Sequence, residues 1–196
     1  MTRSARIQRK THETAIDLVL DLDQPVAGEI KTGSGFLDHM LDLLRKHAGM
    51  GLSVTCHGDT HIDMHHSSED IAICLGEALA QALGDKVGIE RYGFYYVTMD
   101  ECLARVCLDL SGRIAFVWNA PFSLAQIGNL DTELVGHFFR SVAENAKMNL
   151  HVDLLRGGNT HHAIEGIFKA FARALAMAVS PSRRVAGVPS TKGSLV

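Results

Sequence analysis

Hydrophobic residues in the first half of the chain follow two kinds of spacing, the two-residue period of a strand and the spacing of a helix. Between residues 16 and 22 every second residue is isoleucine or leucine, which predicts a half-buried strand. Apolar residues at helical spacing predict a helix over 36–47, and renewed alternation predicts a strand over 52–56. An apolar stripe from Ile71 to Leu83 predicts a further helix, which Gly84 can end.

The second half repeats this order of elements. Alternation from Ala104 to Leu110 predicts a strand, and helical spacing predicts a helix over 132–146. A strand over 148–155 and a helix with a stripe from Ile164 to Ala178 follow. We therefore expect two strands, a helix, a strand and a helix in each half. Residues 187–196 show no regular pattern and are expected to form a tail or loop.

The two halves also match residue by residue. LDHMLDLLRKHAGMGLSV (37–54) aligns with VGHFFRSVAENAKMNLHV (135–152), which pairs His39 with His137. After a two-residue deletion, HHSSEDIAICLGEALAQAL (65–83) aligns with HHAIEGIFKAFARALAMAV (161–179). We interpret this as a duplication within a single domain, with halves over 1–87 and 88–196. The predicted class is α+β: a duplicated two-layer α/β sandwich with helices on one face of each sheet and a pseudo-twofold axis between the halves.

Composition narrows the class of protein. The 196 residues suit one large domain or two small fused ones, and 46% of them are hydrophobic, enough for a sizeable core. A formal net charge of −3 gives no electrostatic argument for binding nucleic acid or an anionic membrane. We expect no membrane span and no secretory signal, because the basic N-terminus lacks an apolar stretch behind it. The four cysteines form no CxxC pair, which favours reduced, mostly buried thiols in a cytoplasmic protein.

Histidine supplies the candidate chemistry. The chain has 11 histidines, and the repeat places an HHxxE run and one isolated histidine in each half. Adjacent residues on a helix lie about 100° apart, so His65 and His66 are poor partners for one ion and good partners for two. A lone histidine is more often an ordinary surface or core residue, but the duplicated set weighs against that interpretation. The set offers two sites of four imidazole and carboxylate ligands, which suit Mn, Fe, Co, Ni or Zn: His39, His65, His66, Glu69, His137, His161, His162 and Glu165.

Basic residues add a weaker signal. Lys169 lies four residues after Glu165, on the same helical face. Arg91 and Arg113 fall at the edges of predicted strands, and the tail offers Ser190 and Lys192. Such residues commonly hold phosphate, although any one of them is more often a solvated surface residue.

Eight motifs together resemble imidazoleglycerol-phosphate dehydratase, a family of histidine biosynthesis. They are GFLDHML (35–41), DMHHSSEDIAICLG (63–76), GIERYG (88–93), MDECL (99–103), DLSGR (109–113), GHFFRS (136–141), HHAIEGIFKAFARAL (161–175) and PSTKGSL (189–195). The resemblance runs from about residue 6 to the C-terminus. It implies the ribosomal protein S5 domain 2-like fold, two Mn²⁺ ions per active site, and a cytoplasmic 24-subunit particle with sites between subunits. The implied reaction converts imidazoleglycerol phosphate to imidazole-acetol phosphate and water.

The resemblance also implies roles for individual residues. One metal would take His39, His65, Glu69 and His161, and the other would take His66, His137, His162 and Glu165. Glu13 resembles a substrate-contacting residue, and the phosphate-binding set would be Arg91, Arg113, Lys169, Ser190 and Lys192. Met64, Thr98 and Gly136 depart from the usual pattern, and Met64 and Gly136 are expected to alter hydrogen bonding around the ligands.

The expected mechanism uses the two nitrogens of the substrate ring. Each nitrogen would bind one Mn²⁺, and the bridged imidazolate would expel the hydroxyl to give a diazafulvene intermediate. Glu165 or Glu13 would move the protons, and the sequence does not choose between them. Two alternatives stay open at this point: a binuclear metallohydrolase acting on a phosphoester, and a protein that only binds or stores metal.

Overall fold

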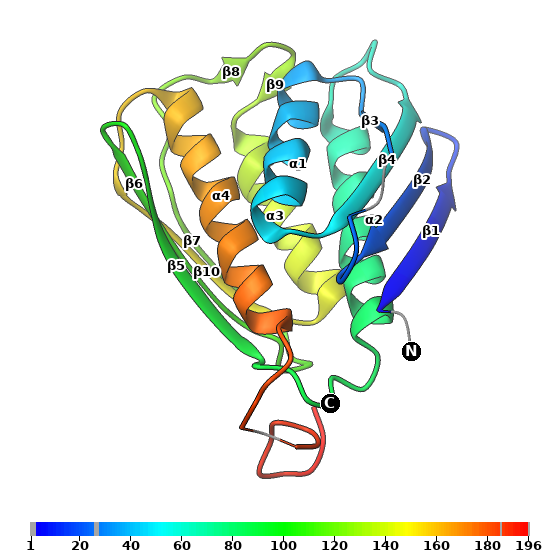
Figure 1. Ribbon diagram of the computed structural model, residues 1–196. Coiled ribbons are helices and arrows are strands. Elements are labelled where there is room, and N and C mark those ends of the chain that lie inside the picture. Colours follow the sequence, from blue (N-terminus) through cyan, green and yellow to red (C-terminus); the bar gives the residue numbers. More distant parts are fainter. Residues whose placement is uncertain (1–2, 26–27, 185, 196) are drawn as a thin grey trace.

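Four long helices lie between two four-stranded sheets (Figure 1). The computed structural model describes residues 3–25, 28–184 and 186–195. The first half contains β1 (Ser4–Lys10), β2 (Thr14–Asp21), β3 (Ile30–Lys31), α1 (Gly35–Ala48), β4 (Gly51–Gly58) and α2 (His65–Leu83). The second half contains β5 (Tyr92–Met99), β6 (Cys102–Asp109), β7 (Ala115–Asn119), β8 (Gln126–Ile127), β9 (Leu130–Asp131), α3 (Glu133–Ala146), β10 (Asn149–Arg156) and α4 (Thr160–Val179).

The sheets show the duplication directly. Their strand orders are β1-β2-β4-β3 and β5-β6-β10-β7, and in each the last strand pairs parallel with its neighbour while the others pair antiparallel. The predicted α+β class and its two similar halves are confirmed. The expected strand count was wrong, because β3 also precedes α1 in the first half, and β7, β8 and β9 also precede α3 in the second. Their pattern is weak: β3 has two residues, and β7 has no fully buried position.

The helices pack in two equivalent pairs, which agrees with the expected twofold axis between the halves. By the repeat, α1 corresponds to α3 and α2 to α4. Helix α1 packs on α4, and α2 packs on α3, so each contact joins a helix of one half to a helix of the other. In Figure 1 the α1/α4 pair faces the viewer and the α2/α3 pair lies behind it. Alternate residues of the sheets, such as Leu18 and Val106, are fully buried toward this helical layer.

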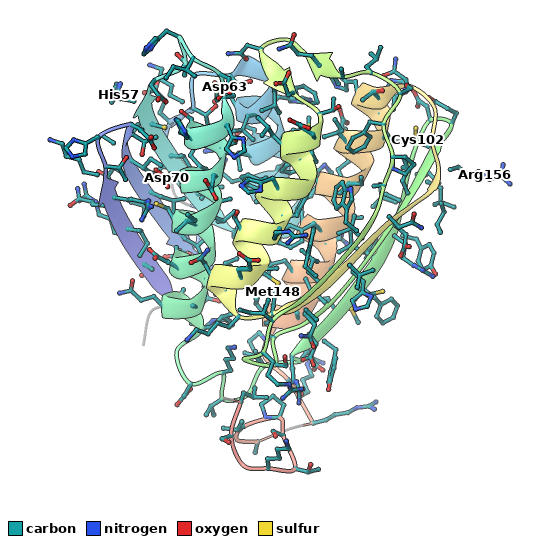
Figure 2. All side chains as sticks on the ribbon, turned by 180° about the vertical axis from the view of Figure 1, so that it is seen from behind. His57, Asp63, Asp70, Cys102, Met148 and Arg156 are labelled. Atoms are coloured by element: carbon teal, nitrogen blue, oxygen red, sulfur yellow. The ribbon has the colours of Figure 1, made fainter. Side chains whose placement is uncertain are left out.

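Local capping places the histidine pairs in the first turn of α2 and α4. The side chain of Asp63 accepts a hydrogen bond from the backbone N–H of His65 at 2.7 Å. Its counterpart in the repeat, Asn159, accepts from the N–H of His161 at 2.9 Å. Figure 2 shows Asp63 at the end of α2 where that helix begins. Capped first turns fix the direction in which these side chains leave the helix.

Three further sequence predictions can be compared with the structure. Cys56, Cys74 and Cys102 are buried and unpaired, as expected, and burial raises the pKa of Cys74 to about 12. None of the helices in the described ranges is long and apolar enough to cross a membrane. The tail forms turns without helix or strand over its described residues, as predicted.

Candidate metal centres and anion pocket

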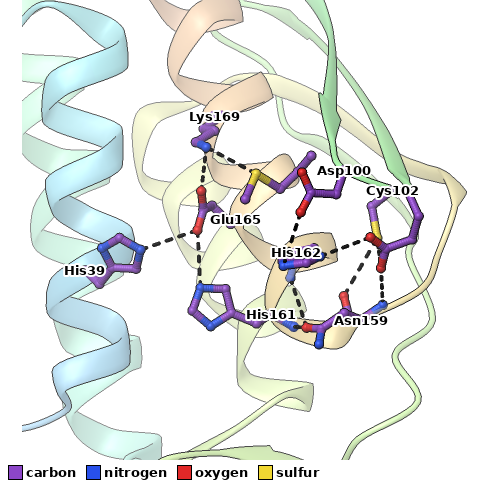
Figure 3. A network of polar contacts seen from close by, with 10 residues as sticks. His39, Asp100, Cys102, Asn159, His161, His162, Glu165 and Lys169 are labelled. Carbon is purple, nitrogen blue, oxygen red and sulfur yellow. Dashed lines mark hydrogen bonds and ion pairs between the residues drawn. The ribbon is translucent and has the colours of Figure 1, made fainter.

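One cluster of possible metal ligands lies between α1 and α4 (Figure 3). His39 comes from α1, and His161 and Glu165 come from α4. The Oε2 atom of Glu165 lies 3.4 Å from Nε2 of His39 and 3.2 Å from Nε2 of His161. The three ligand atoms lie within 4.8 Å of one another, a separation that one cation can bridge. We refer to these residues as the α1/α4 cluster.

The carboxylate of this cluster is held in its charged form. Burial by itself would raise the pKa of Glu165, but its polar neighbours together lower the pKa, and the ammonium of Lys169 contributes most of that lowering. Hydrogen bonds from His39 and His161 act in the same direction. An ionised carboxylate beside two imidazoles is the state that a divalent cation requires.

A second cluster lies between α2 and α3, on the other side of the helical layer. His65 and Glu69 come from α2 and His137 comes from α3, again with ligand atoms within 4.8 Å of one another. Nε2 of His137 lies 3.1 Å from Oε1 of Glu69. That nitrogen is buried and has no aligned hydrogen-bond partner among the described residues. These residues, the α2/α3 cluster, are the counterparts of the α1/α4 cluster in the repeat.

The second histidine of each pair points elsewhere, as the helix geometry predicted. Nδ1 of His66 lies 2.9 Å from Oδ2 of Asp59, and its Nε2 lies 3.7 Å from Oε1 of Glu13. Nδ1 of His162 lies 3.0 Å from Oε2 of Glu101. The carboxylates raise the pKa of both rings, the hydrogen bond being the main cause.

Asp59 and Glu101 were not anticipated from the sequence. The His66 ring holds the pKa of Asp59 below its usual range. The backbone N–H of Asn159 and then the His162 ring hold the pKa of Glu101 down at about 2. Carboxylates on the outer nitrogen of a ligating imidazole are a common feature of metal sites, but no spacing along the chain pairs these residues with their histidines.

The single chain does not assemble either predicted set of four ligands. It brings His39 and His161, which the resemblance assigns to one metal, to Glu165, which it assigns to the other. In the same way it brings His65 and Glu69 to His137. Since the expected sites lie between subunits, the division of the eight ligands between two metals stays a prediction.

Four of the predicted phosphate residues gather at one cavity. Arg91, Arg113, Ser190 and Lys192 line a space of about 680 Å³ beside the tail. The guanidinium of Arg91 donates to both carboxylate oxygens of Asp109, at 2.6 and 2.9 Å, and to the carbonyl of Pro189 at 2.8 Å. These hydrogen bonds fix the position of the Arg91 side chain in the cavity wall.

The other two members of the predicted substrate set lie elsewhere. Lys169 pairs with Glu165 in the α1/α4 cluster, and Glu13 lies beside His66. The cavity follows the end of α4, whereas His161 and His162 open that helix. A helix of 20 residues spans about 30 Å, so in one chain the anion pocket and the histidines of α4 lie far apart.

The family model and the relatives that match this chain carry the same family description. The family model described as imidazoleglycerol-phosphate dehydratase matches residues 32–175. An imidazoleglycerol-phosphate dehydratase of Cereibacter sphaeroides is 52% identical over 194 residues, covering 98% of this chain and 100% of that protein. The enzyme of Staphylococcus carnosus is 53% identical over 190 residues, covering 97% of this chain and 98% of its own.

Solved structures agree in fold. The crystal structure of imidazoleglycerol-phosphate dehydratase from Staphylococcus aureus aligns with a TM-score of 0.83 and 45% identity, covering 91% of this chain and 99% of that one. The structure from Pyrococcus furiosus aligns with a TM-score of 0.82 and 33% identity, covering 96% and 100%.

Proposed function

Because this chain belongs to the imidazoleglycerol-phosphate dehydratase family, whose members are hydro-lyases of histidine biosynthesis, we propose that it acts on the family's substrate. The reaction would convert D-erythro-1-(imidazol-4-yl)glycerol 3-phosphate to 3-(imidazol-4-yl)-2-oxopropyl phosphate and water. The observation that carries the proposal is the pair of equivalent His, His and Glu clusters, one on each side of the helical layer. We also expect the enzyme in the cytoplasm, in keeping with its unpaired cysteines.

The residues present suit two Mn²⁺ ions per active site. Imidazole and carboxylate ligands without thiolate favour such a cation. The buried Nε2 of His137, which lacks an aligned hydrogen-bond partner within the described residues, suits a metal ligand. Bound ions would supply Lewis-acid chemistry that makes the substrate's imidazole easier to deprotonate.

The internal symmetry suggests how the ligands divide. The repeat exchanges His65 with His161 and His66 with His162, so the predicted sets map onto each other if one of the two histidine pairs changes places. If His65 and His66 change places, each glutamate shares an ion with the histidine three residues before it. If His161 and His162 change places, each glutamate shares an ion with the histidine four residues before it. The contact of 3.2 Å between His161 and Glu165 supports that pairing. We therefore favour His162 with His39, His65 and Glu69, and His161 with His66, His137 and Glu165.

The positions of the sites support an active site shared between subunits. The anion pocket lies beyond the end of α4 and the histidines of that helix lie at its beginning, about 30 Å away. A three-carbon phosphate attached to one imidazole ring is far shorter than this distance. If both sets of residues serve one substrate, they must come from different copies of the chain. The 24-subunit particle expected from the family resemblance would provide such neighbours.

Between the two candidate proton carriers the surroundings favour Glu13. Both carboxylate oxygens of Glu165 are engaged, one by Lys169 and the other by His39 and His161. With its pKa lowered, Glu165 is a weak base and a suitable metal ligand. Glu13 is more than half exposed and lies 3.7 Å from Nε2 of His66, close to the reacting centre without being tied to it.

The phosphate end of the substrate would bind in the cavity beside the tail. Arg91 is held by Asp109 and Pro189, so its guanidinium is presented without further loss of conformational freedom. Arg113, Ser190 and Lys192 add two more cations and a hydroxyl group to the cavity wall, which also contains Glu90. The distance between this pocket and the metal ligands of a neighbouring copy would then select substrates of one length.

The experiment that tests the proposal follows two products at once. Purified protein is stripped of metal, reloaded with Mn²⁺ and incubated with imidazoleglycerol phosphate. We expect metal-dependent formation of an enolisable ketone with no release of inorganic phosphate, and a particle many times heavier than the 21.3 kDa chain. Phosphate release without ketone would support a binuclear hydrolase instead. Metal binding without either product would support a metal-storage role.

A further inference from the structure

Glu101, in the turn between β5 and β6, reaches the start of α4. Its Oε1 accepts a hydrogen bond from the backbone N–H of Asn159 at 2.6 Å, and its Oε2 lies 3.0 Å from Nδ1 of His162. Gly158 makes room for this approach, because a Cβ atom there would overlap the carboxylate of Glu101. The same carboxylate therefore fixes the backbone before the helix and one nitrogen of a candidate metal ligand.

In the first half a different residue contacts Nδ1 of the equivalent histidine. There Asp59, just after β4, contacts Nδ1 of His66 at 2.9 Å. The repeat places Gly157 opposite Asp59, so the second half has no side chain at that point. It also places Glu101 opposite Glu13, since both occupy the hairpin before the second strand of their half. Glu101 therefore makes the contact to Nδ1 that Asp59 makes in the first half, whereas Glu13 lies near Nε2 of His66.

We infer that Glu101 is a positioning residue that keeps the proton of His162 on Nδ1 and leaves Nε2 free to bind metal. A ring that donates from Nδ1 to a carboxylate has its lone pair on Nε2. The inference rests on the proposed function, because it assigns the free nitrogen to one of the two metal sites.

The geometry predicts an unusual result for Glu101→Gln. The N–H of Asn159 needs an acceptor, so the amide oxygen of the new side chain should face Asn159. The amide NH₂ would then face Nδ1 of His162 and donate to it. Nδ1 becomes an acceptor, the ring proton moves to Nε2, and the metal-facing nitrogen is blocked.

The tautomer can be measured in the metal-free protein by ¹⁵N NMR of the histidine rings, at a pH where they are neutral. We expect the proton of His162 on Nδ1 in the wild type and on Nε2 in E101Q. Asp100→Asn is the matched control: it removes the same charge one residue away, but the Asp100 carboxylate lies 3.7 Å from the other nitrogen of His162. D100N should keep the wild-type tautomer. A wild-type proton on Nε2, or the same tautomer in wild type and E101Q, would overturn the inference.

A second readout is binding of Mn²⁺ alone, by calorimetry. E101Q should bind one of the two ions per chain roughly 10–100-fold more weakly, the range seen for partners of metal ligands. Gly158→Ala should do the same by displacing the Glu101 carboxylate, which covers the case in which E101Q fails to fold. Unchanged affinity for both ions in the folded variants would contradict the role. Because neither readout uses turnover, a wild-type protein that lacks dehydratase activity would refute the proposed function separately.

Discussion

The two histidine clusters occupy equivalent positions in the repeat, yet their carboxylates have different surroundings. The side chain of Glu165 is 9% exposed and pairs with Lys169 one turn later on α4. The side chain of Glu69 is 38% exposed, and the repeat places Ile73 where the other half has Lys169. The ligands are therefore the same in both halves, while the charge that supports them is not.

Neighbouring positions show the same divergence. Asp38, beside His39, accepts hydrogen bonds from the backbone and side chain of Thr32, both at 2.7 Å. Its counterpart Gly136 has no side chain, and a Cβ there would touch Trp118. Gly136 and His137 line a space of about 550 Å³. Equivalent ligands in the two halves are therefore held by different neighbouring residues.

The strongest test of equivalence is to remove one ligand from each half. Replacing His66 or His162 with alanine should each remove one Mn²⁺ per subunit and abolish turnover, because both ions are needed on one substrate ring. Metal content by mass spectrometry of the loaded particle, together with ketone formation, measures the effect. A full metal complement with a normal rate in either variant would contradict its ligand role. Loss in only one variant would show that the halves are not equivalent.

The lysine that distinguishes the clusters can be replaced by its counterpart. Lys169→Ile makes the second half resemble the first and leaves the buried Glu165 carboxylate without its cation. The metal-free protein should lose about 3 kcal/mol in free energy of unfolding, as expected when one partner of a buried pair is removed. Urea denaturation measures this loss, and Mn²⁺ should restore part of it.

A matched control for this lysine lies on the surface. Lys31→Met breaks the ion pair with Glu29, whose side chains are 68% and 56% exposed. Such pairs contribute little, so the free energy of unfolding should change by less than about 1 kcal/mol. Equal losses for the two lysine variants would show that burial of Glu165 does not matter.

The sequence predicted the helices and the duplication well, because these leave a periodic or repeated trace. The eight histidine and glutamate ligands stay a prediction, and the structure brings six of them together in two clusters. Burial on one face fixes the alternation in β2 and β6, and the HHxxE run appears twice. It missed β7, which has no fully buried residue, and it missed the partners Asp59 and Glu101. Those contacts depend on how loops approach a helix end, and the two halves use different loops. The separation of Lys169 from the anion pocket was also missed. It depends on the path of the tail after α4 ends, which leaves no pattern in the sequence.

The tail is a further difference between the halves, since it lines an anion pocket that follows the last helix of the second half. Lys192→Ala removes one cation from the cavity wall and should raise KM roughly tenfold, the weight of one charge-assisted hydrogen bond, with kcat little changed. Arg184→Ala, in the same segment but outside the cavity wall, should leave both constants as they are. Steady-state kinetics at fixed ionic strength measures both variants, and an unchanged KM for K192A would remove it from the phosphate set.

The smallest expected effect is the pH dependence of the Glu101–His162 contact in the metal-free protein. The pKa of Glu101 is lowered to about 2, so its contribution to stability is present above the unfolded value of about 4.3 and is lost as pH falls toward 2. The pKa of His162 is raised, so its contribution is present below the unfolded value of about 6.5 and is lost as pH rises through the raised pKa. The difference in free energy of unfolding between wild type and E101Q should therefore be largest between about pH 4.3 and 6.5 and should shrink on both sides. Urea midpoints across this range measure the difference, with Glu29→Gln as an exposed control that should stay near zero. A difference that shrinks at low pH but does not change as pH rises above about 6.5 would mean that Glu101 supports α4 through Asn159 alone.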